Sequence, residues 1–297
     1  MPEVVLLPQW LQPPRIAGVE YHWWDHGQPD PPAHVLASVT LFVPPYMPVP
    51  DDLRFVGDMP RLALVQALMA GIDGIRPHVP ADIPVLPAVG VHDTSTAELA
   101  VGLAIASQRG IDVAARDTVA GTWRHERRRA LADSDVAIVG WGGAGRAIGA
   151  RLEPFEATVT PFSRRGIDAR PVEEFDGLLP GFDIVILALP LTDSGPFMHR
   201  ERLARMKDGA LLVNVGRGGL VDQDALLTHL SSGRLRAALD VTDPEPLPAD
   251  HPLWRAPGLL ITPHVGGDST AFVPRARKMI NRLITERAAN GSLSGPA

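Results

Sequence analysis

Three polar residues in the last third of the chain have the side chains that acid–base chemistry on a small carboxylic acid requires. Arg217 comes just after the apolar run LLVNV, Glu245 lies in the segment DVTDPEP, and His264 follows the apolar run LLIT. A planar arginine guanidinium binds a carboxylate through paired hydrogen bonds. A histidine beside a glutamate donates a proton near neutral pH, because the carboxylate orients the imidazole and raises its pKa. These residues predict a site that grips a carboxylate and protonates a carbonyl oxygen as hydride reaches the carbon.

Each of the three residues also has a simpler interpretation. A single histidine after a strand is often structural, a glutamate between prolines is often a loop charge, and the arginine of GRGG could cap a helix. Their joint placement favours the functional interpretation. Each lies at or just after the carboxyl end of an expected parallel strand, where such sheets build their sites.

The elements that must position these residues are expected to be strands of one parallel sheet. From Asp135 onward, apolar runs alternate with polar segments of helical pattern, which is typical of a doubly wound α/β sheet buried on both faces. The runs are DVAIVG, ATVTPF, DIVILALP, ALLVNVG, RAALDV and LLITPH.

The first of these runs ends in the glycine pattern G-x-G-x-x-G, at Gly140, Gly142 and Gly145. The pattern follows a strand and opens a helix, as a dinucleotide-binding turn must. Gly140 would permit the tight turn, Gly142 the approach of a pyrophosphate, and Gly145 close packing of helix on strand. The alternative is a glycine-rich turn that binds no ligand.

The end of the second strand predicts which dinucleotide binds. An NAD enzyme usually has an acidic residue there, about 20 residues after the glycines, for the ribose hydroxyls. This chain has Ser163, followed by Arg164 and Arg165. A serine and two guanidiniums suit a 2′-phosphate that a carboxylate would repel. We therefore expect NADP(H) to be preferred over NAD(H); the alternative is that both arginines lie in a solvated loop.

The first part of the chain is less regular. The runs EVVLLP, HVLASVTLFVP and RLALVQALMAGID are expected to be strands or short buried segments between proline-rich loops. A helix is expected from about Ser95 to Ser107, capped by Thr94, Ser95 or Thr96, and a last helix over 269–288.

Composition limits the class of protein. A chain of 297 residues is long enough for two domains, and a net charge of −6 argues against general nucleic-acid binding. The absence of cysteine excludes disulfides, thiolate metal sites and a cysteine nucleophile. No apolar stretch reaches the ~18 residues that span a bilayer, and the N-terminus does not read as a signal peptide. We therefore expect a cytoplasmic protein with no membrane partner.

The order of these motifs resembles that of the D-isomer-specific 2-hydroxyacid dehydrogenase family. The resemblance runs from about residue 63 to 267 through LMAGIDGI, TAELAVGLAIA, VGWGGAGRAIG, LALPLT, MKDGALLVNVGRGGLVDQDAL, ALDVTDPEPLP, HPLW and LITPHVGG. It implies an α/β architecture in which a doubly wound Rossmann cofactor domain, residues 99–267, is inserted into a smaller flavodoxin-like substrate domain, residues 1–98 with 268–297.

The resemblance also implies residue roles. Arg217, Glu245 and His264 correspond to the catalytic set, and the backbone at Ala70 and Gly71 to the part that contacts the substrate carboxylate. Pro190, Val215, Gly216 and Asp240 would line the nicotinamide side. The further cofactor positions are Gly143, Ala144 and Gly266, and Gly143 stands where many relatives have a larger residue.

Two branches of the family fit poorly. The formate-oxidising branch has a glutamine at the position of Glu245, and the phosphite-oxidising branch has a lysine at that of Ala70. This leaves small 2-keto acids such as glyoxylate or hydroxypyruvate, or a larger analogue, and an NADPH preference suggests reduction. The alternative is a regulatory protein that senses NADP(H) on the same fold without catalysis.

Two further segments have competing interpretations. The arginine-rich segment TWRHERRRALADS is expected to be a solvated helix or a dimer arm rather than a nucleic-acid site, and the resemblance implies a homodimer that it embraces. His22, Trp23, Trp24, Asp25 and His26 have poor spacing for metal ligands on one strand. We expect a surface-edge segment there, and the proposed chemistry needs no metal.

Overall fold

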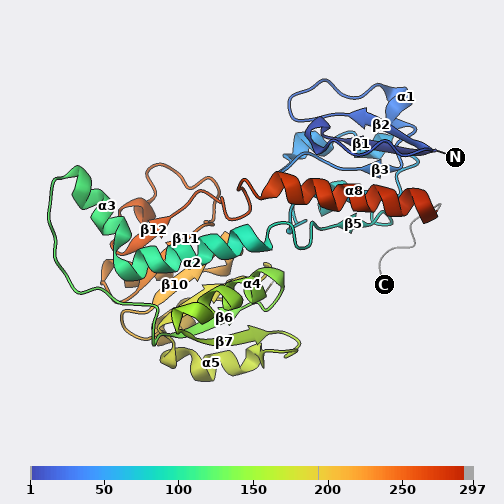
Figure 1. The fold of residues 1–297 in the computed structure, drawn as a ribbon. Helices are drawn as coiled ribbons and strands as arrows, with labels where there is room; N and C mark the ends of the chain where they lie inside the picture. The colour runs from blue at the N-terminus through green and yellow to red at the C-terminus, as the bar shows by residue number, and fades with distance from the viewer. Residues whose placement is uncertain (1, 193, 291–297) are drawn as a thin grey trace. The chain divides into compact units, whose positions relative to one another are not determined.

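The computed structural model describes residues 2–192 and 194–290. The chain forms two compact units, residues 1–92 with 270–297 and residues 93–269 (Figure 1). The sequence-based boundary after residue 98 cuts through the helix α2 (Asp93–Arg109), which belongs entirely to the second unit. The last seven residues of the predicted substrate domain, 291–297, lie outside the described residues.

The smaller unit is built on a parallel sheet with the strand order β2-β1-β3-β4-β5 among the described residues. This is the flavodoxin-like order, which has its topological switch point between β1 and β3. The strands are β1 (Glu3–Leu7), β2 (Val19–Trp23), β3 (Leu41–Phe42), β4 (Leu64–Gln66) and β5 (Val85–Leu86).

Alternating side chains of β1 place apolar groups on both faces of this sheet. Val5 and Leu7 pack with the helix α8 (Phe272–Asn290), whose Phe272, Ala276, Ile280 and Ile284 recur every four residues on one face. Leu6 faces the other side, in a core that includes the helix α1 (Ala33–Leu36). The sheet is therefore covered on both faces, as parallel sheets require.

The larger unit is built on a second parallel sheet, which in the described part of the chain has the order β12-β11-β10-β9-β6-β7-β8. The glycine-rich turn follows β6, the strand at which the order reverses, and this is where doubly wound sheets bind ligands. The strands are β6 (Asp135–Val139), β7 (Thr158–Ser163), β8 (Arg170–Pro171), β9 (Ile184–Leu187), β10 (Leu211–Asn214), β11 (Arg236–Leu239) and β12 (Leu259–Ile261).

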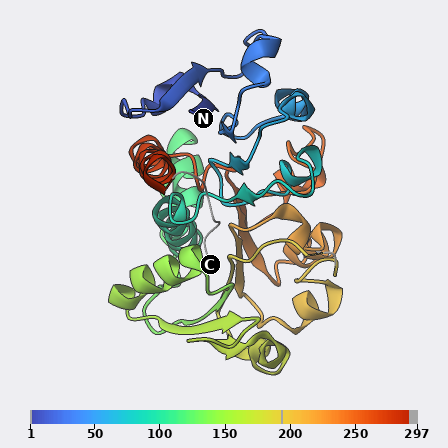
Figure 2. The same ribbon diagram turned by 90° about the vertical axis from the view of Figure 1, so that its right-hand side faces the viewer.

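Helices cover both faces of this sheet (Figure 2). Val136 and Ile138 face the core formed with α2 and α4 (Gly143–Leu152), whereas Ala137 and Val139 face the opposite core. That second core contains residues of α5 (Phe175–Leu178), α6 (Arg200–Arg205) and α7 (Gln223–Ser231). The helix α3 (Ile111–Val119) follows α2 and has no buried residue.

The fold class predicted from the sequence is confirmed, and all six apolar runs contain strands of the larger sheet. The prediction did not identify β2, β5 or β8. The strand β2 lies at a sheet edge and mixes polar with aromatic residues, and β5 and β8 have two residues each. The first part of HVLASVTLFVP forms α1 rather than a strand.

The helix expected in the arginine-rich segment is not formed. Residues 122–130 have no helix or strand and are exposed. Two of its guanidiniums pair with nearby carboxylates, Arg124 with Asp117 at 2.8 Å and Arg128 with Glu126 at 2.8 Å. The dimer-arm interpretation of this segment stays a prediction.

Candidate active site

The loop after β10 carries Arg217 and is held by a buried amide. Asn214 is fully buried at the end of the strand; its Oδ1 accepts the backbone N–H of Gly216 at 3.0 Å, and its Nδ2 donates to the carbonyl of Arg217 at 2.8 Å. The guanidinium Nη1 of Arg217 donates to the carbonyl of Gly216 at 2.7 Å. The position of Arg217 is thus set by bonds that begin inside the sheet.

The loops after β10 and β11 touch at Gly218. A Cβ atom there would lie 1.8 Å from the carbonyl oxygen of Thr242, so only glycine lets the two backbones approach so closely. This contact brings the segment that carries Arg217 beside the segment that carries Glu245.

A buried carboxylate fixes the third loop. Asp240, at the end of β11, is 2% exposed, and its Oδ1 accepts the Thr262 hydroxyl at 2.6 Å and the Val265 N–H at 3.0 Å. Its Oδ2 accepts the N–H of Gly266 at 2.8 Å, and its backbone carbonyl accepts the N–H of His264 at 2.8 Å. Both carboxylate oxygens therefore orient the loop in which His264 lies.

His264 has a backbone φ of +54°, in the left-handed region that is unfavourable for a residue with a Cβ. Residues in this region are retained where the surrounding structure over-determines them. Here Asp240 supplies that restraint on both sides of His264.

Glu245 and His264 form a direct pair. The Nδ1 of His264 lies 2.8 Å from Oε2 of Glu245, and a carboxylate only accepts, so Nδ1 carries the hydrogen. The other oxygen of Glu245, Oε1, accepts the backbone N–H of Thr242 at 3.0 Å. The carboxylate is thus oriented by the loop after β11, and Nε2 is the nitrogen of His264 that remains for a substrate.

The pair changes the pKa of both members. The hydrogen bond to Glu245 raises the pKa of His264, and the charges of Glu245 and Asp240 add to this, while burial and Arg217 oppose it. Burial raises the pKa of the Glu245 carboxyl, but the hydrogen bonds from His264 and Thr242 and the charges of His264 and Arg217 together lower it. Because Arg217 acts on both groups, the three predicted catalytic residues lie together in the larger unit.

The directions of these two pKa shifts define the pH range in which the pair stabilises the fold. The contribution of His264 is complete below its unfolded-state pKa and is lost as pH rises through its raised folded-state pKa. The contribution of Glu245 is complete above its unfolded-state pKa and is lost as pH falls through its lowered folded-state pKa. Protonated His264 and ionised Glu245 therefore coexist at pH values between the folded-state pKa of Glu245 and that of His264.

The glycine-rich turn has the close backbone contacts that the G-x-G-x-x-G pattern predicts. Gly140 has φ +103°, and a Cβ there would lie 2.4 Å from the carbonyl oxygen of Ala188. A Cβ on Gly145 would lie 1.9 Å from the carbonyl oxygen of Gly140, so helix and strand pack in close contact. By contrast, a Cβ on Gly142 would meet nothing within 4 Å, which leaves room at the start of α4. Ala144 lies in the first turn of this helix.

The end of β7 fits a phosphate group. The hydroxyl of Ser163 is buried and has no hydrogen-bond partner among the described residues. Rotation about its χ1 would break no existing hydrogen bond. Arg164 and Arg165 are exposed, and no ion pair joins either of them to another residue of the described chain.

The other predicted positions fall in two groups. Pro190 is exposed after β9, and Val215, Gly216 and Gly266 lie at the ends of β10 and β12 in the larger unit. Ala70 and Gly71 belong to the smaller unit, in the loop after β4, where the Nε2 of His92 lies 2.6 Å from the carbonyl oxygen of Leu68.

Sequence reasoning missed the supporting role of Asn214 and assigned Asp240 only to the nicotinamide side. A polar residue at the end of an otherwise apolar strand was the available signal for both. Such a residue is buried, so its hydrogen bonds must be satisfied locally.

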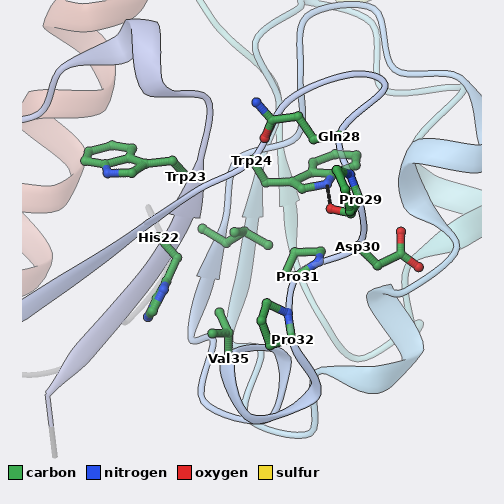
Figure 3. Close-up of a pocket in the computed structure, with 10 residues that line it drawn as sticks. His22, Trp23, Trp24, Gln28, Pro29, Asp30, Pro31, Pro32 and Val35 are labelled. Carbon is green, nitrogen blue, oxygen red and sulfur yellow. Dashed lines mark hydrogen bonds between the residues drawn. The ribbon is translucent and has the colours of Figure 1, made fainter.

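The segment from His22 to His26 is a surface edge only in part. His22 and Trp23 end the edge strand β2, whereas Trp24 is 3% exposed and its ring packs edge-on against Phe55 in the core. Together with the loop before α1, His22, Trp23 and Trp24 line a pocket of about 220 Å³, in which the Nε1 of Trp24 donates to the carbonyl of Pro29 (Figure 3). Within residues 2–192 and 194–290, no cluster of three histidine, aspartate or glutamate side chains could hold a metal ion. In the same part of the chain, no helix is long and apolar enough to cross a membrane.

Comparison with known proteins agrees with this geometry. Residues 101–266 match the family model described as D-isomer specific 2-hydroxyacid dehydrogenase, NAD binding domain. The chain is 31% identical to the human glyoxylate reductase/hydroxypyruvate reductase, over 95% of this chain and 89% of that protein. It is 30% identical to D-3-phosphoglycerate dehydrogenase of Mycobacterium bovis, over 92% of this chain and 54% of that protein.

The chain is also similar to a member of this family whose structure is solved. The D-isomer specific 2-hydroxyacid dehydrogenase from Xanthobacter autotrophicus Py2, in complex with NADPH and MES, superposes with a TM-score of 0.80 at 26% identity. The match covers 99% of this chain and 96% of that one. The chain belongs to the D-isomer-specific 2-hydroxyacid dehydrogenase family, whose members are NAD(P)-dependent enzymes acting on small 2-hydroxy or 2-keto acids.

The geometry of the pair predicts the effect of removing the carboxylate. Glu245→Gln should lower the pKa of His264, because the hydrogen bond and charge of Glu245, which raise it most, are lost while burial and Arg217 still oppose the protonated form. An NMR titration of the imidazole carbon-bound protons measures this. The His264 signal is the one that disappears in His264→Gln.

The matched control is Glu201→Gln, which removes the carboxylate 2.6 Å from Nδ1 of His199 on the surface. It should leave the His264 titration unchanged. An unchanged His264 pKa in Glu245→Gln would contradict the pairing.

Proposed function

We propose that this protein reduces a small 2-keto acid to the corresponding 2-hydroxy acid, with NADPH preferred over NADH. The observation that carries the proposal is the 2.8 Å contact between Nδ1 of His264 and Oε2 of Glu245, with Arg217 on the neighbouring loop. A histidine oriented in this way can donate a proton to the substrate. An arginine can bind the carboxylate of a keto acid through paired hydrogen bonds.

Each residue of the site has a separate role in the proposed reaction. Arg217 binds the substrate carboxylate and so orients the keto group. His264, through Nε2, donates a proton to the carbonyl oxygen and becomes neutral. Glu245 holds the imidazole by its Nδ1–H and keeps its pKa raised, so that the acid form is populated near neutrality. The backbone at Ala70 and Gly71 is proposed to contact the same carboxylate.

A nicotinamide cofactor, when bound, supplies the hydride that reaches the keto carbon. The residues proposed to hold it are the following: Gly140, Gly142, Gly143, Ala144, Gly145, Ser163, Arg164, Arg165, Pro190, Val215, Gly216, Asp240 and Gly266. Asp240 acts through the backbone it fixes, because both of its carboxylate oxygens already accept hydrogen bonds from the loop of His264.

The preference for NADPH rests on the end of β7. The unpartnered hydroxyl of Ser163 and the two neighbouring guanidiniums would meet a 2′-phosphate with charge-assisted hydrogen bonds. The relative of known structure from Xanthobacter autotrophicus binds NADPH, which supports this choice. We also propose that the chain acts as a homodimer through the exposed segment 122–130.

The function is tested by following NADPH oxidation at 340 nm with glyoxylate, hydroxypyruvate, pyruvate and phenylpyruvate, with NADH in parallel. We expect turnover of at least one keto acid. Arg217→Lys should lower kcat/KM at least about a hundredfold, mainly through KM, because a lysine cannot make the paired hydrogen bonds of a guanidinium.

Measurable cofactor binding without turnover of any of these acids would contradict the proposal and favour a regulatory protein that senses NADP(H). Turnover that is indifferent to Arg217→Lys would keep the enzyme but contradict the role of this arginine.

The cofactor preference has its own test. Replacing both Arg164 and Arg165 with alanine should lower kcat/KM for NADPH about a hundredfold, since each charge-assisted hydrogen bond contributes ~1.5–3 kcal/mol, while NADH changes about threefold or less. The control is Arg170→Ala, which removes a nearby surface guanidinium that is paired with Glu174 at 2.8 Å. Equal losses with both cofactors would contradict the assignment of these arginines to the 2′-phosphate.

A further inference from the structure

A carboxylate lies against the glycine-rich turn. Gly143 is in the first turn of α4, and a Cβ atom there would lie 1.9 Å from Oδ2 of Asp93, 2.6 Å from its Cγ and 3.0 Å from its Oδ1. The carboxylate of Asp93 therefore occupies the space that a side chain at position 143 would need.

The position of this carboxylate is set by helix packing. Asp93 is the first residue of α2, which belongs to the same unit as α4. Ala97 and Ala100 of α2 share one buried core with Ile148 and Leu152 of α4. The start of α2 is therefore held beside the start of α4 by two helices in contact, not by a loose loop.

The carboxylate lies where a pyrophosphate is also expected. The start of α4 presents backbone N–H groups and the positive end of the helix dipole, which stabilise a nearby negative charge. The dinucleotide pyrophosphate binds at this end of the helix in folds of this class. Two anions at one helix terminus repel each other, since charges a few ångströms apart near a surface interact by about 1–4 kcal/mol.

We propose that Asp93 sets the affinity of the cofactor. Without cofactor, its carboxylate stabilises the start of α4. With cofactor, the same charge opposes the pyrophosphate, so that binding is weaker and release faster than the glycine-rich turn alone would give. The proposal rests on the binding of a dinucleotide at this turn, as in the proposed function.

A purely structural role for Asp93 makes a different prediction. If the side chain only connected α2 to α4, its removal would destabilise the protein and would weaken cofactor binding or leave it unchanged. The proposed role requires opposite signs: lower stability without cofactor and tighter binding of cofactor.

The test uses the full chain and two substitutions, Asp93→Asn and Asp93→Ala. The asparagine keeps the shape of the side chain, whereas the alanine removes both charge and hydrogen-bonding groups. Calorimetric titration with NADPH and with NADH should give a Kd about tenfold lower in both variants. The difference should shrink between 0.05 and 0.5 M salt, because salt screens the repulsion. Thermal unfolding without cofactor should show a lower Tm.

Glu153→Gln is the matched control. Glu153 is an exposed acid at the C-terminal end of α4, so the substitution removes the same charge from the other end of the same helix. Ten helical residues span about 15 Å, which exceeds the screening length of about 8 Å at physiological salt. The Kd for NADPH should not change.

A second pair of variants tests the contact itself. Gly143→Ala should lower the Tm of the wild-type chain, because the added methyl group meets the carboxylate. The same substitution in the Asp93→Ala background should cost less stability, because the carboxylate is gone. Equal costs in the two backgrounds would contradict the contact.

The outcomes separate the two proposals. Wild-type protein that binds NADPH with a Kd that neither Asp93 variant lowers would overturn the role of Asp93 and leave the proposed function intact. Wild-type protein that binds neither NADPH nor NADH would contradict the proposed function.

Discussion

The buried carboxylate of Asp240 is the constraint on which the candidate site depends. It accepts three hydrogen bonds from the loop after β12, and its backbone carbonyl accepts the N–H of His264. Such bonds to an ionised acceptor are strong and directional. They hold His264 in a left-handed backbone conformation that the residue would not adopt alone. The imidazole of His264 gains a fixed direction from this arrangement.

At the neighbouring strand ends, other polar groups also hold the loops of the site by hydrogen bonds. Asn214 fixes the loop of Arg217 from inside the sheet, and Thr242, in the loop after β11, fixes the carboxylate of Glu245. Gly218 lets the first two loops touch. The side chains of Arg217, Glu245 and His264 thus lie in loops that are hydrogen-bonded to buried strand ends, so that their positions depend on the parallel sheet.

The sequence predicted the larger unit well because its strands are buried on both faces and therefore read as continuous apolar runs. It singled out Arg217, Glu245 and His264 because polar residues after such runs are conspicuous, and the structure places these three side chains near one another. The smaller unit was predicted less well. The strand β2 mixes polar and aromatic residues at an edge, and β5 has two residues, too few for a periodic signal. The contact between Asp93 and Gly143 joins residues far apart in the sequence, and only the packing of α2 on α4 reveals it.

The proposed role of Glu245 is to act through His264, and a double-mutant cycle can test this coupling. We would measure kcat/KM for keto-acid reduction in the wild type, in Glu245→Gln, in His264→Ala and in the double variant. The single losses should be on the order of a hundredfold for Glu245→Gln and a thousandfold for His264→Ala. The double variant should be no slower than His264→Ala alone, because an orienting carboxylate has no effect without its imidazole. Losses that multiply in the double variant would contradict it and would assign Glu245 a role independent of His264.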